Sequence, residues 1–157
     1  MVGVRAATKA DLPALAEIWL ELMEQHELTD ARFRLSADAL NRWKRLASDV
    51  MNRADGFLLM AEWDGRAAGF CLGWIARNPP IYAVHEVGFV SELAVRQALR
   101  RRGVGRALIE GAKDWFRKRG VTEFHLSTAI WNQDARAFWT AVGGEPLLIR
   151  YRFPLAD

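Results

Sequence analysis

The first part of the chain shows an extended pattern and then two helical patterns of apolar residues. A short run at residues 3–7 predicts a strand, and Thr8 with Asp11 resembles a capping box at the start of a helix. The apolar positions of that helix are Leu12, Leu15, Ala16, Trp19, Leu22 and Met23. The same spacing predicts a second helix over residues 37–52, with Ser36 as its N-cap. Its inward-facing residues are Leu40, Trp43, Ala47 and Val50.

Strand patterns dominate the middle of the chain. Residues 57–63 and 66–76 are apolar runs separated by the Asp-Gly pair at 64–65, which readily adopts the positive φ angles of a tight hairpin turn. A third run, residues 84–95, predicts a long strand in which Gly88 marks a candidate bulge. The middle of the chain therefore predicts three consecutive strands.

Helix and strand patterns alternate in the last third. We expect a helix over residues 103–120, a strand over 122–130, a helix from Asn132 to the glycine pair at 143–144, and a final strand over 147–153. The complete order is strand, two helices, three strands, helix, strand, helix, strand. This order predicts the α/β (α+β) class, with a mixed sheet that has helices on both faces.

Length and composition restrict the class of protein. The 157 residues suffice for one core but not for two ordinary domains, so we expect a single domain over residues 1–157. The chain is 51% hydrophobic and 26% charged, which is typical of a globular protein, and no apolar run reaches the ~18 residues of a membrane span. Charges stand where a signal peptide would have its apolar segment. We therefore expect a cytoplasmic protein that does not bind a membrane.

Cysteine and histidine usage argues against disulfide and metal chemistry. A single cysteine cannot form an internal disulfide, and three widely spaced histidines give no cluster of metal ligands. Cys71 lies in an apolar run without an adjacent base, which predicts a buried structural thiol rather than a nucleophile.

Positive charge is concentrated at one predicted helix start. The formal net charge is +3, but residues 96–106 contain five arginines and no acid, so the other residues carry −2. Three of these arginines, residues 100–102, directly precede Gly103 and Gly105. Backbone N–H groups at a helix start lack partners within the helix and lie at the positive end of its dipole, and glycine leaves them accessible. The segment predicts a diphosphate site, although a solvated basic helix start would have the same pattern.

Two common phosphate motifs do not match this segment. No Gly-Lys-Ser/Thr follows the glycines, and the third residue after Gly105 is Leu108 where a dinucleotide fingerprint has glycine. These differences argue against a nucleoside triphosphate or a nicotinamide cofactor.

The arginine-glycine segment resembles the signature of the GNAT N-acetyltransferases. Arg100-x-x-Gly103-x-Gly105 is preceded by "ELAV" and followed by an amphipathic helix. Three further stretches are similar to the family in the correct order: "VRAATKADLPAL" to its start, "AEWDGRAAGF" to its central hairpin and "NQDARAFWTAVGG" to its last helix. The resemblance implies a mostly antiparallel sheet, in which the long strand splays from the strand that follows the third helix. It also implies acetyl-CoA as co-substrate.

The resemblance assigns roles in binding acetyl-CoA. The main chain of residues 93–95 would contact the pantetheine arm as an added strand would, and residues 100–106 would hold the diphosphate. Asn132 would line the far side of the gap between the splayed strands, a role it could combine with capping the helix. The residues implied are Leu93, Ala94, Val95, Arg100, Arg101, Arg102, Gly103, Val104, Gly105, Arg106, Asn132 and Trp139.

Two glutamates on the long strand are candidates for the general base. A neutral amine must attack the thioester, so a proton must pass from the amine to a base, directly or through water. Glu92 and Glu86 share one face of a regular strand, unless a bulge intervenes. Glu92 is the preferred candidate because it is nearer the reactive end. Each glutamate also has a plain interpretation as a solvated or ion-paired strand residue.

The chain departs from the family pattern at two positions. Trp139 stands where many members have the tyrosine that protonates the leaving thiolate, and an indole N–H is no practical acid. Either Trp139 only packs against the co-substrate, or the acid lies elsewhere, with Tyr82 and Tyr151 the only tyrosines available. Gly144 replaces a usual phenylalanine, and we expect this change to affect packing.

The acceptor is not specified by the sequence. The family architecture implies that residues 26–35 and 77–83 wall the acceptor pocket, and Glu24, Glu27 and Asp30 either attract a cationic amine or form a solvated helix end. A small-molecule or peptide amine fits this reading. The resemblance implies that the final apolar strand could support a homodimer, as it does in members of that family.

Three functions from different classes are compatible with these observations. The first is an N-acetyltransferase and the second is a non-catalytic acyl-CoA-binding module, which the missing tyrosine leaves open. The third is a nucleic-acid-binding protein, which would need a wider basic surface interleaved with aromatic residues. Most of the seven tryptophans have core spacing instead, so we expect no nucleic-acid partner.

Overall fold

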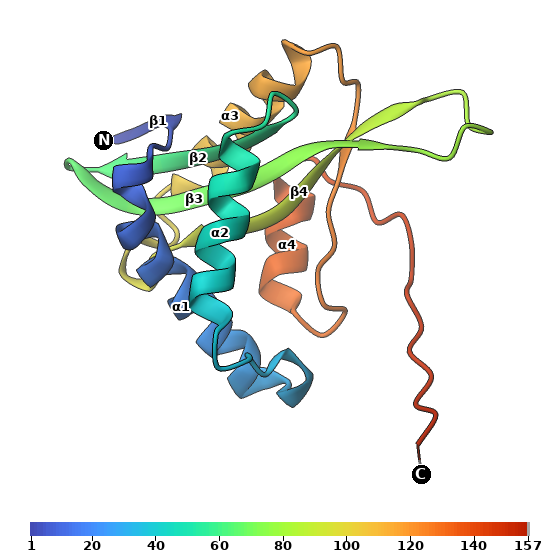
Figure 1. The fold of residues 1–157 in the computed structure, drawn as a ribbon, viewed down its shortest axis with the longest axis horizontal. Helices are drawn as coiled ribbons and strands as arrows, with labels where there is room; N and C mark the ends of the chain where they lie inside the picture. Colours follow the sequence, from blue (N-terminus) through green and yellow to red (C-terminus); the bar gives the residue numbers. More distant parts are fainter. Residues whose placement is uncertain (157) are drawn as a thin grey trace. The chain divides into compact units, whose positions relative to one another are not determined.

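The computed structural model describes residues 1–156, which form two compact units, one from Met1 to Ser127 and one from Thr128 onward. The first unit contains a five-stranded sheet in the order β1-β2-β3-β4-β5 (Figure 1). Its strands are β1 (Val2–Ala6), β2 (Gly56–Trp63), β3 (Arg66–Arg77), β4 (Glu86–Val95) and β5 (Phe124–His125). The pairs β1–β2, β2–β3 and β3–β4 are antiparallel, and β5 is parallel to β4. The predicted mixed, mostly antiparallel sheet is therefore confirmed.

The turn between β2 and β3 has the predicted conformation. Asp64 has a φ of 49° and Gly65 a φ of 75°, as a tight hairpin turn requires. The turn sets the pairing of Trp63 with Arg66 and thereby the register at the start of the hairpin.

Helices cover both faces of the sheet. The three helices of this unit are α1 (Leu12–Thr29), α2 (Ala39–Met51) and α3 (Val104–Arg117). In Figure 1, α1 and α2 lie in front of the sheet and α3 lies behind it. The core on the α1–α2 side joins Leu15, Ile18, Trp19, Trp43, Ala47 and Val50 to Leu58, Met60, Phe70, Leu72 and Ala94 of the sheet. None of the helices in the described residues is both long and apolar enough to cross a membrane.

The starts of α1 and α2 differ in how well the sequence predicts them. The Thr8 backbone N–H donates to the Asp11 carboxylate at 2.7 Å, as the capping-box pattern predicts, and a short 3₁₀ turn at Lys9–Asp11 precedes α1. The prediction of Ser36 as N-cap of α2 is wrong, because Asp38 occupies that position and the helix begins at Ala39. Ser36 accepts a backbone hydrogen bond from Ala39 in the preceding turn instead.

The bulge in β4 lies at Ser91 and not at Gly88. Leu72 pairs with Glu92 while the next residue, Gly73, pairs with Val90, so Ser91 is the extra residue. Gly88 is paired regularly and is required for close packing, since a Cβ there would lie 2.5 Å from a ring carbon of Phe116.

Two strands predicted near the end of the chain are shorter or absent. The strand predicted over residues 122–130 is reduced to β5, and Ile130 is 66% exposed. Residues 147–153 form no strand, because their alternating pattern has no paired neighbour in the described residues. The second unit does contain the predicted helix α4 (Gln133–Ala141), and Asn132 caps it by accepting a hydrogen bond from the Ala135 N–H at 3.1 Å.

Candidate active site

The start of α3 is an open turn with backbone donors that have no partner within the helix. Gly103 is the N-cap, with a φ of 84° that an L-residue would adopt only with strain, and a Cβ there would meet nothing within 4 Å. The first backbone bond of the helix joins the Ala107 N–H to the Gly103 carbonyl at 3.0 Å. The N–H groups of Val104 and Gly105 precede that bond and point out of the helix start. This arrangement can bind phosphate oxygens.

The arginines around this turn have different neighbours. Arg100 donates to Gln25 Oε1 at 2.9 Å and to the Val95 carbonyl at 3.4 Å. The Arg102 guanidinium lies 5.7 Å from the centre of the Trp63 ring. Arg101 is exposed and adopts a left-handed φ of 61°. Arg106 is also exposed.

Arg96 does not belong with this basic group. Its guanidinium bonds to Glu17 and Glu21 of α1, both at 3.3 Å, and its Nε donates to the Ala67 carbonyl at 2.8 Å. Arg96 therefore ties the end of β4 to α1, and the positive field of the turn comes from the four arginines at residues 100–102 and 106.

The end of β4 diverges from β5. Leu93, Ala94 and Val95 pair with Cys71, Phe70 and Gly69 of β3. On the other side, β4 pairs with β5 only through Gly88 with Phe124 and Phe89 with His125. Within the described residues, β5 therefore leaves the backbone edge of residues 90–95 unpaired, which confirms the predicted splay. An extended ligand can use such an edge as an added strand would.

Glu92 lies largely buried between the sheet and the helices α1 and α2. The Nε1 of Trp43 lies 3.1 Å from each of its two carboxylate oxygens. Burial raises the pKa of Glu92 from 4.5 to about 7, because the ionised form loses hydration, and hydrogen bonding to Trp43 and Trp19 acts in the opposite direction. A carboxyl group with this pKa can accept a proton at neutral pH.

The bulge separates the two glutamate candidates. Glu86 pairs with Arg77 and Glu92 pairs with Leu72, and these two β3 residues point to opposite faces. The two glutamates also lie near opposite ends of β4, roughly 20 Å apart at the usual rise per strand residue. The expectation that Glu86 and Glu92 share a face, which holds only for a regular strand, is therefore wrong for this strand.

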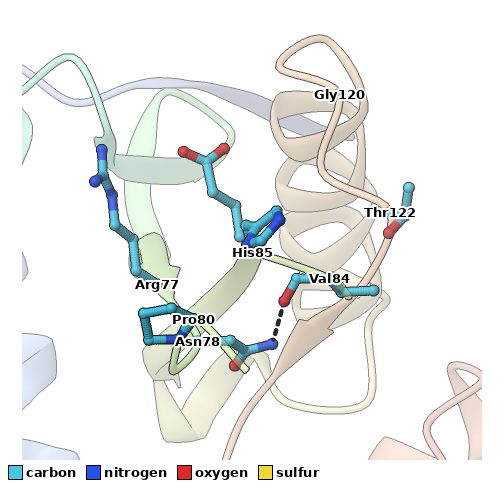
Figure 2. Close-up of a pocket in the computed structure, with 8 residues that line it drawn as sticks. Arg77, Asn78, Pro80, Val84, His85, Gly120 and Thr122 are labelled. Carbon is cyan, nitrogen blue, oxygen red and sulfur yellow. Dashed lines mark hydrogen bonds between the residues drawn. The ribbon is translucent and has the colours of Figure 1, made fainter. Parts of the chain in front are cut away.

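Glu86 is exposed and borders a different feature of the surface. Figure 2 shows an open hollow at the far end of the β3–β4 hairpin, where the Asn78 side chain donates to the Val84 carbonyl at 2.9 Å. The residues lining the hollow are Arg77, Asn78, Pro80, Val84, His85, Glu86, Gly120 and Thr122. None of them belongs to the turn at the start of α3.

Cys71 is fully buried on β3, next to Leu93 of β4. Burial raises the pKa of its thiol well above the ordinary range, and the nearby charge of Glu92 adds to this effect. The prediction of a structural thiol is confirmed.

The second unit contains the two remaining residues that the sequence implicated. Asn132 uses its Oδ1 as the cap of α4, and the half-buried Trp139 packs edge-on against Phe138 with ring centres 5.0 Å apart. A Cβ on Gly144 would lie 2.9 Å from the Trp139 carbonyl oxygen. Packing therefore explains why this chain has glycine at position 144.

The acidic residues at the end of α1 differ in their partners. Asp30 caps a short 3₁₀ turn by accepting a hydrogen bond from the Arg32 backbone, and it forms an ion pair with the Arg32 side chain. Glu24 and Glu27 are exposed on α1. Asp30 thus has a structural role, which leaves Glu24 and Glu27 as the acids that can attract an amine here.

Sequence reasoning did not identify Trp43 and Trp19 as part of the site. Both occupy positions of the apolar helical pattern, which predicts core residues, and both are indeed buried, at 3% and 6% exposure. Only the placement of Ser91 in the bulge, which turns Glu92 toward the helices, brings the carboxylate to them.

Comparisons with known proteins give a consistent family. The family model described as "Acetyltransferase (GNAT) family" matches residues 13–143. An uncharacterized N-acetyltransferase of Archaeoglobus fulgidus is 29% identical over 88% of this chain and 89% of its own length. The L-2,4-diaminobutyric acid acetyltransferase of Nocardia farcinica is 34% identical, over 55% of this chain and 42% of the relative. The aminoglycoside N(6')-acetyltransferase type 1 of Klebsiella aerogenes is 33% identical, over 61% of this chain and 63% of the relative.

Solved structures share the fold at low sequence identity. A tetramutant of the BH1408 protein of Bacillus halodurans has a TM-score of 0.84 and 17% identity, over 98% of this chain and 99% of that one. An aminoglycoside 6'-N-acetyltransferase of Acinetobacter haemolyticus has a TM-score of 0.76 and 22% identity, with 99% of each chain covered. These likenesses establish the fold.

The buried carboxyl group of Glu92 gives a prediction about stability. The native state retains a proton on Glu92 that the unfolded chain releases near pH 4.5, so the free energy of unfolding falls as the pH rises toward about 7. Glu92→Gln removes this loss, and we expect the variant to be more stable than wild type at pH 8 by about 2 to 3 kcal/mol. Urea denaturation from pH 4.5 to pH 8 measures the difference.

The exposed Glu86→Gln variant is the matched control and should follow the wild-type pH dependence. If the free energy of unfolding changes with pH in the same way in Glu92→Gln and in wild type, then Glu92 is not a buried carboxyl group that stays protonated in the native state.

Proposed function

The chain belongs to the acetyltransferase (GNAT) family, and we propose that it is an acetyl-CoA-dependent N-acetyltransferase of a primary amine on a small molecule or peptide. The observation that carries this proposal is the open Gly103 turn at the start of α3, close in the chain to the unpaired edge of β4. The family model spans both compact units, which supports one functional domain over residues 1–157.

The donor set at this turn fits acetyl-CoA. Backbone N–H groups of the helix start and arginine side chains suit its diphosphate, and the β4 edge suits the amide groups of its pantetheine arm. Acetyl-CoA supplies an acetyl group activated as a thioester. The residues that we assign to its binding are Leu93, Ala94, Val95, Arg100, Arg101, Arg102, Gly103, Val104, Gly105, Arg106, Asn132 and Trp139.

Glu92 is the general base in this proposal. An ammonium ion has no lone pair, so the acceptor must lose a proton to attack the thioester. With a pKa raised to about 7, Glu92 is ionised in much of the population at neutral pH and is more basic than an ordinary carboxylate. Glu86 is the alternative base, but it is exposed at the far end of β4.

Trp139 packs against the co-substrate in this proposal and does not supply an acid. Its indole N–H can donate a hydrogen bond, but it does not release the proton near neutral pH. The leaving thiolate of the co-substrate takes its proton from water in this proposal, because a thiol of this kind has a pKa of ~8.5. This feature of Trp139 favours the second candidate function, a non-catalytic acyl-CoA-binding module. The elevated pKa of Glu92 favours the enzyme instead, because a binding module needs no base.

The acceptor class rests on the named relatives and on the acidic residues of α1. One named relative acetylates L-2,4-diaminobutyric acid and another acetylates an aminoglycoside, and both acceptors are amines. Glu24 and Glu27 are exposed and can attract a cationic amine toward the end of α1.

The proposed active form is a cytoplasmic homodimer. Six large apolar side chains near the C-terminus are at least 67% exposed: Leu147, Leu148, Ile149, Tyr151, Phe153 and Leu155. Exposed apolar side chains grouped in one segment are typical of an interaction surface. A second copy of the chain can cover this apolar segment. Because β5 is an edge strand of the sheet, its free backbone groups can pair with the same segment of the second copy.

Replacement of two arginines tests the diphosphate site. Arg100→Ala combined with Arg102→Ala should weaken acetyl-CoA binding by roughly tenfold or more, because each charge-assisted hydrogen bond contributes about 1.5 to 3 kcal/mol. Isothermal titration calorimetry measures the dissociation constant. The pair Arg42→Ala and Arg45→Ala on α2, where both arginines face Asp38, is the control and should leave it unchanged. Equal affinity of the Arg100/Arg102 variant and wild type would place the diphosphate elsewhere.

Removal of the base should abolish most of the turnover. With any amine that supports thiol release, Glu92→Gln should lower kcat by about 10² to 10⁴-fold, and the increase in rate around pH 7 should disappear. Glu86→Gln should retain the wild-type rate and pH profile. The reverse result, with Glu86→Gln inactive and Glu92→Gln active, would exchange the two assignments.

The dimer has its own test by light scattering coupled to gel filtration. The wild-type protein should have twice the 17.8 kDa mass of the chain. Ile149→Asp combined with Tyr151→Asp should give monomers, because a charge in an apolar interface is costly. Arg150→Ser combined with Arg152→Ser, at the alternate positions of the same segment, should remain dimeric. A monomeric wild-type protein would refute the dimer.

A further inference from the structure

The carboxylate of Glu92 is held by an indole from a different element of the fold. Trp43 lies on α2, and its Nε1 is 3.1 Å from both oxygens of Glu92 on β4. We infer that Trp43 is a positioning residue, whose N–H fixes the Glu92 carboxylate and favours its ionised form. This inference rests on the proposed function, in which Glu92 is the general base.

The Trp43 ring is fixed before any ligand binds. It is 3% exposed, and it contacts Trp19 of α1, with ring centres 5.5 Å apart and an interplanar angle of 21°, and Phe70 of β3, with ring centres 5.3 Å apart. A ring that is almost fully buried against two aromatic neighbours cannot swing its N–H away without displacing core side chains. The donor direction is therefore set by the packing of α1, α2 and the sheet, and it does not depend on the acceptor.

An equal distance to both oxygens restricts the carboxylate more than a single hydrogen bond would. A single bond leaves the group free to rotate about its last bond, whereas a shared donor favours the rotamer in which both oxygens face the indole. Because an indole N–H only donates, it stabilises the carboxylate in preference to the neutral acid. Trp43 therefore opposes the effect of burial and keeps the pKa of Glu92 near neutrality.

The other charged groups around Glu92 do not replace this contact. On β3, the Cys71 thiol has a raised pKa and stays neutral, and on α1, Glu17 and Glu21 are paired with Arg96 of the β4 end. The charged residues of α2 flanking Trp43 are the exposed Arg42, Arg45 and Asp49 and the half-buried Lys44. The pKa of Glu92 is set by burial and by the two tryptophans.

Carbon-13 NMR of the carboxyl group tests this inference without an acceptor amine. In protein labelled at the glutamate side-chain carboxyl, the Glu92 signal is identified by its loss in Glu92→Gln. In Trp43→Phe, which keeps an aromatic ring and removes the donor, we expect the pKa of Glu92 to rise by about one unit or more. Trp115→Phe is the matched control, since Trp115 belongs to α3 and packs on Phe57, with ring centres 4.8 Å apart. An unchanged pKa in folded Trp43→Phe overturns the inference.

A second measurement leaves Trp43 in place and therefore remains valid if Trp43→Phe fails to fold. Seven tryptophans give seven indole N–H signals in a nitrogen-15 spectrum. The signal of Trp43 should shift with the same midpoint as Glu92 and become independent of pH in Glu92→Gln. If no indole N–H signal shifts with the midpoint of Glu92, the inference is overturned. Both measurements report on Trp43 alone, whereas loss of turnover in Glu92→Gln reports on the proposed function.

Discussion

One extra residue in β4 determines which side of the sheet receives the catalytic candidate. Side chains alternate along a strand, so the insertion of Ser91 reverses the direction of the side chains after it relative to those before it. Without it, Glu92 would share the face of Gly88, where a Cβ would already meet the Phe116 ring of α3. With it, Glu92 faces α1 and α2, where Trp43 provides a donor for its carboxylate. The bulge thus makes burial of this carboxylate tolerable.

The charged groups at the two ends of the proposed site differ in their exposure to water. At the start of α3, the arginines are exposed and the backbone donors lie beside an open glycine, so a polyanion can bind without displacing core side chains. At Glu92, the carboxylate is removed from water and depends on indole hydrogen bonding, which makes its protonation sensitive to small changes in packing. Arg96 lies between them in the chain and serves the fold, because its pairing with Glu17 and Glu21 attaches α1 to the end of β4.

Local signals in the sequence predicted the features that depend on local backbone conformation. The Asp-Gly pair predicted the hairpin turn, Gly103 predicted the start of α3, and Asn132 predicted the cap of α4, since each requires a specific φ angle or a nearby side-chain acceptor. The position of the bulge could not be predicted in this way. It depends on how Leu72 and Gly73 pair across the sheet, and Gly88 has the same sequence signal for the different reason of close packing. The alternating pattern at 147–153 likewise predicted a strand, but a strand also requires a neighbour, which the described sheet does not provide.

An enzyme and a protein that only binds acyl-CoA differ in whether the thioester is consumed. The most direct measurement is thiol release from acetyl-CoA by the purified protein at pH 8, with and without a panel of primary amines that includes L-2,4-diaminobutyric acid, an aminoglycoside and peptides with free N-termini. We expect release that requires one of these amines and that yields one acetylated amine for each thiol. Tight binding of acetyl-CoA with no amine-dependent release across the panel would contradict the enzymatic function and would favour the binding module.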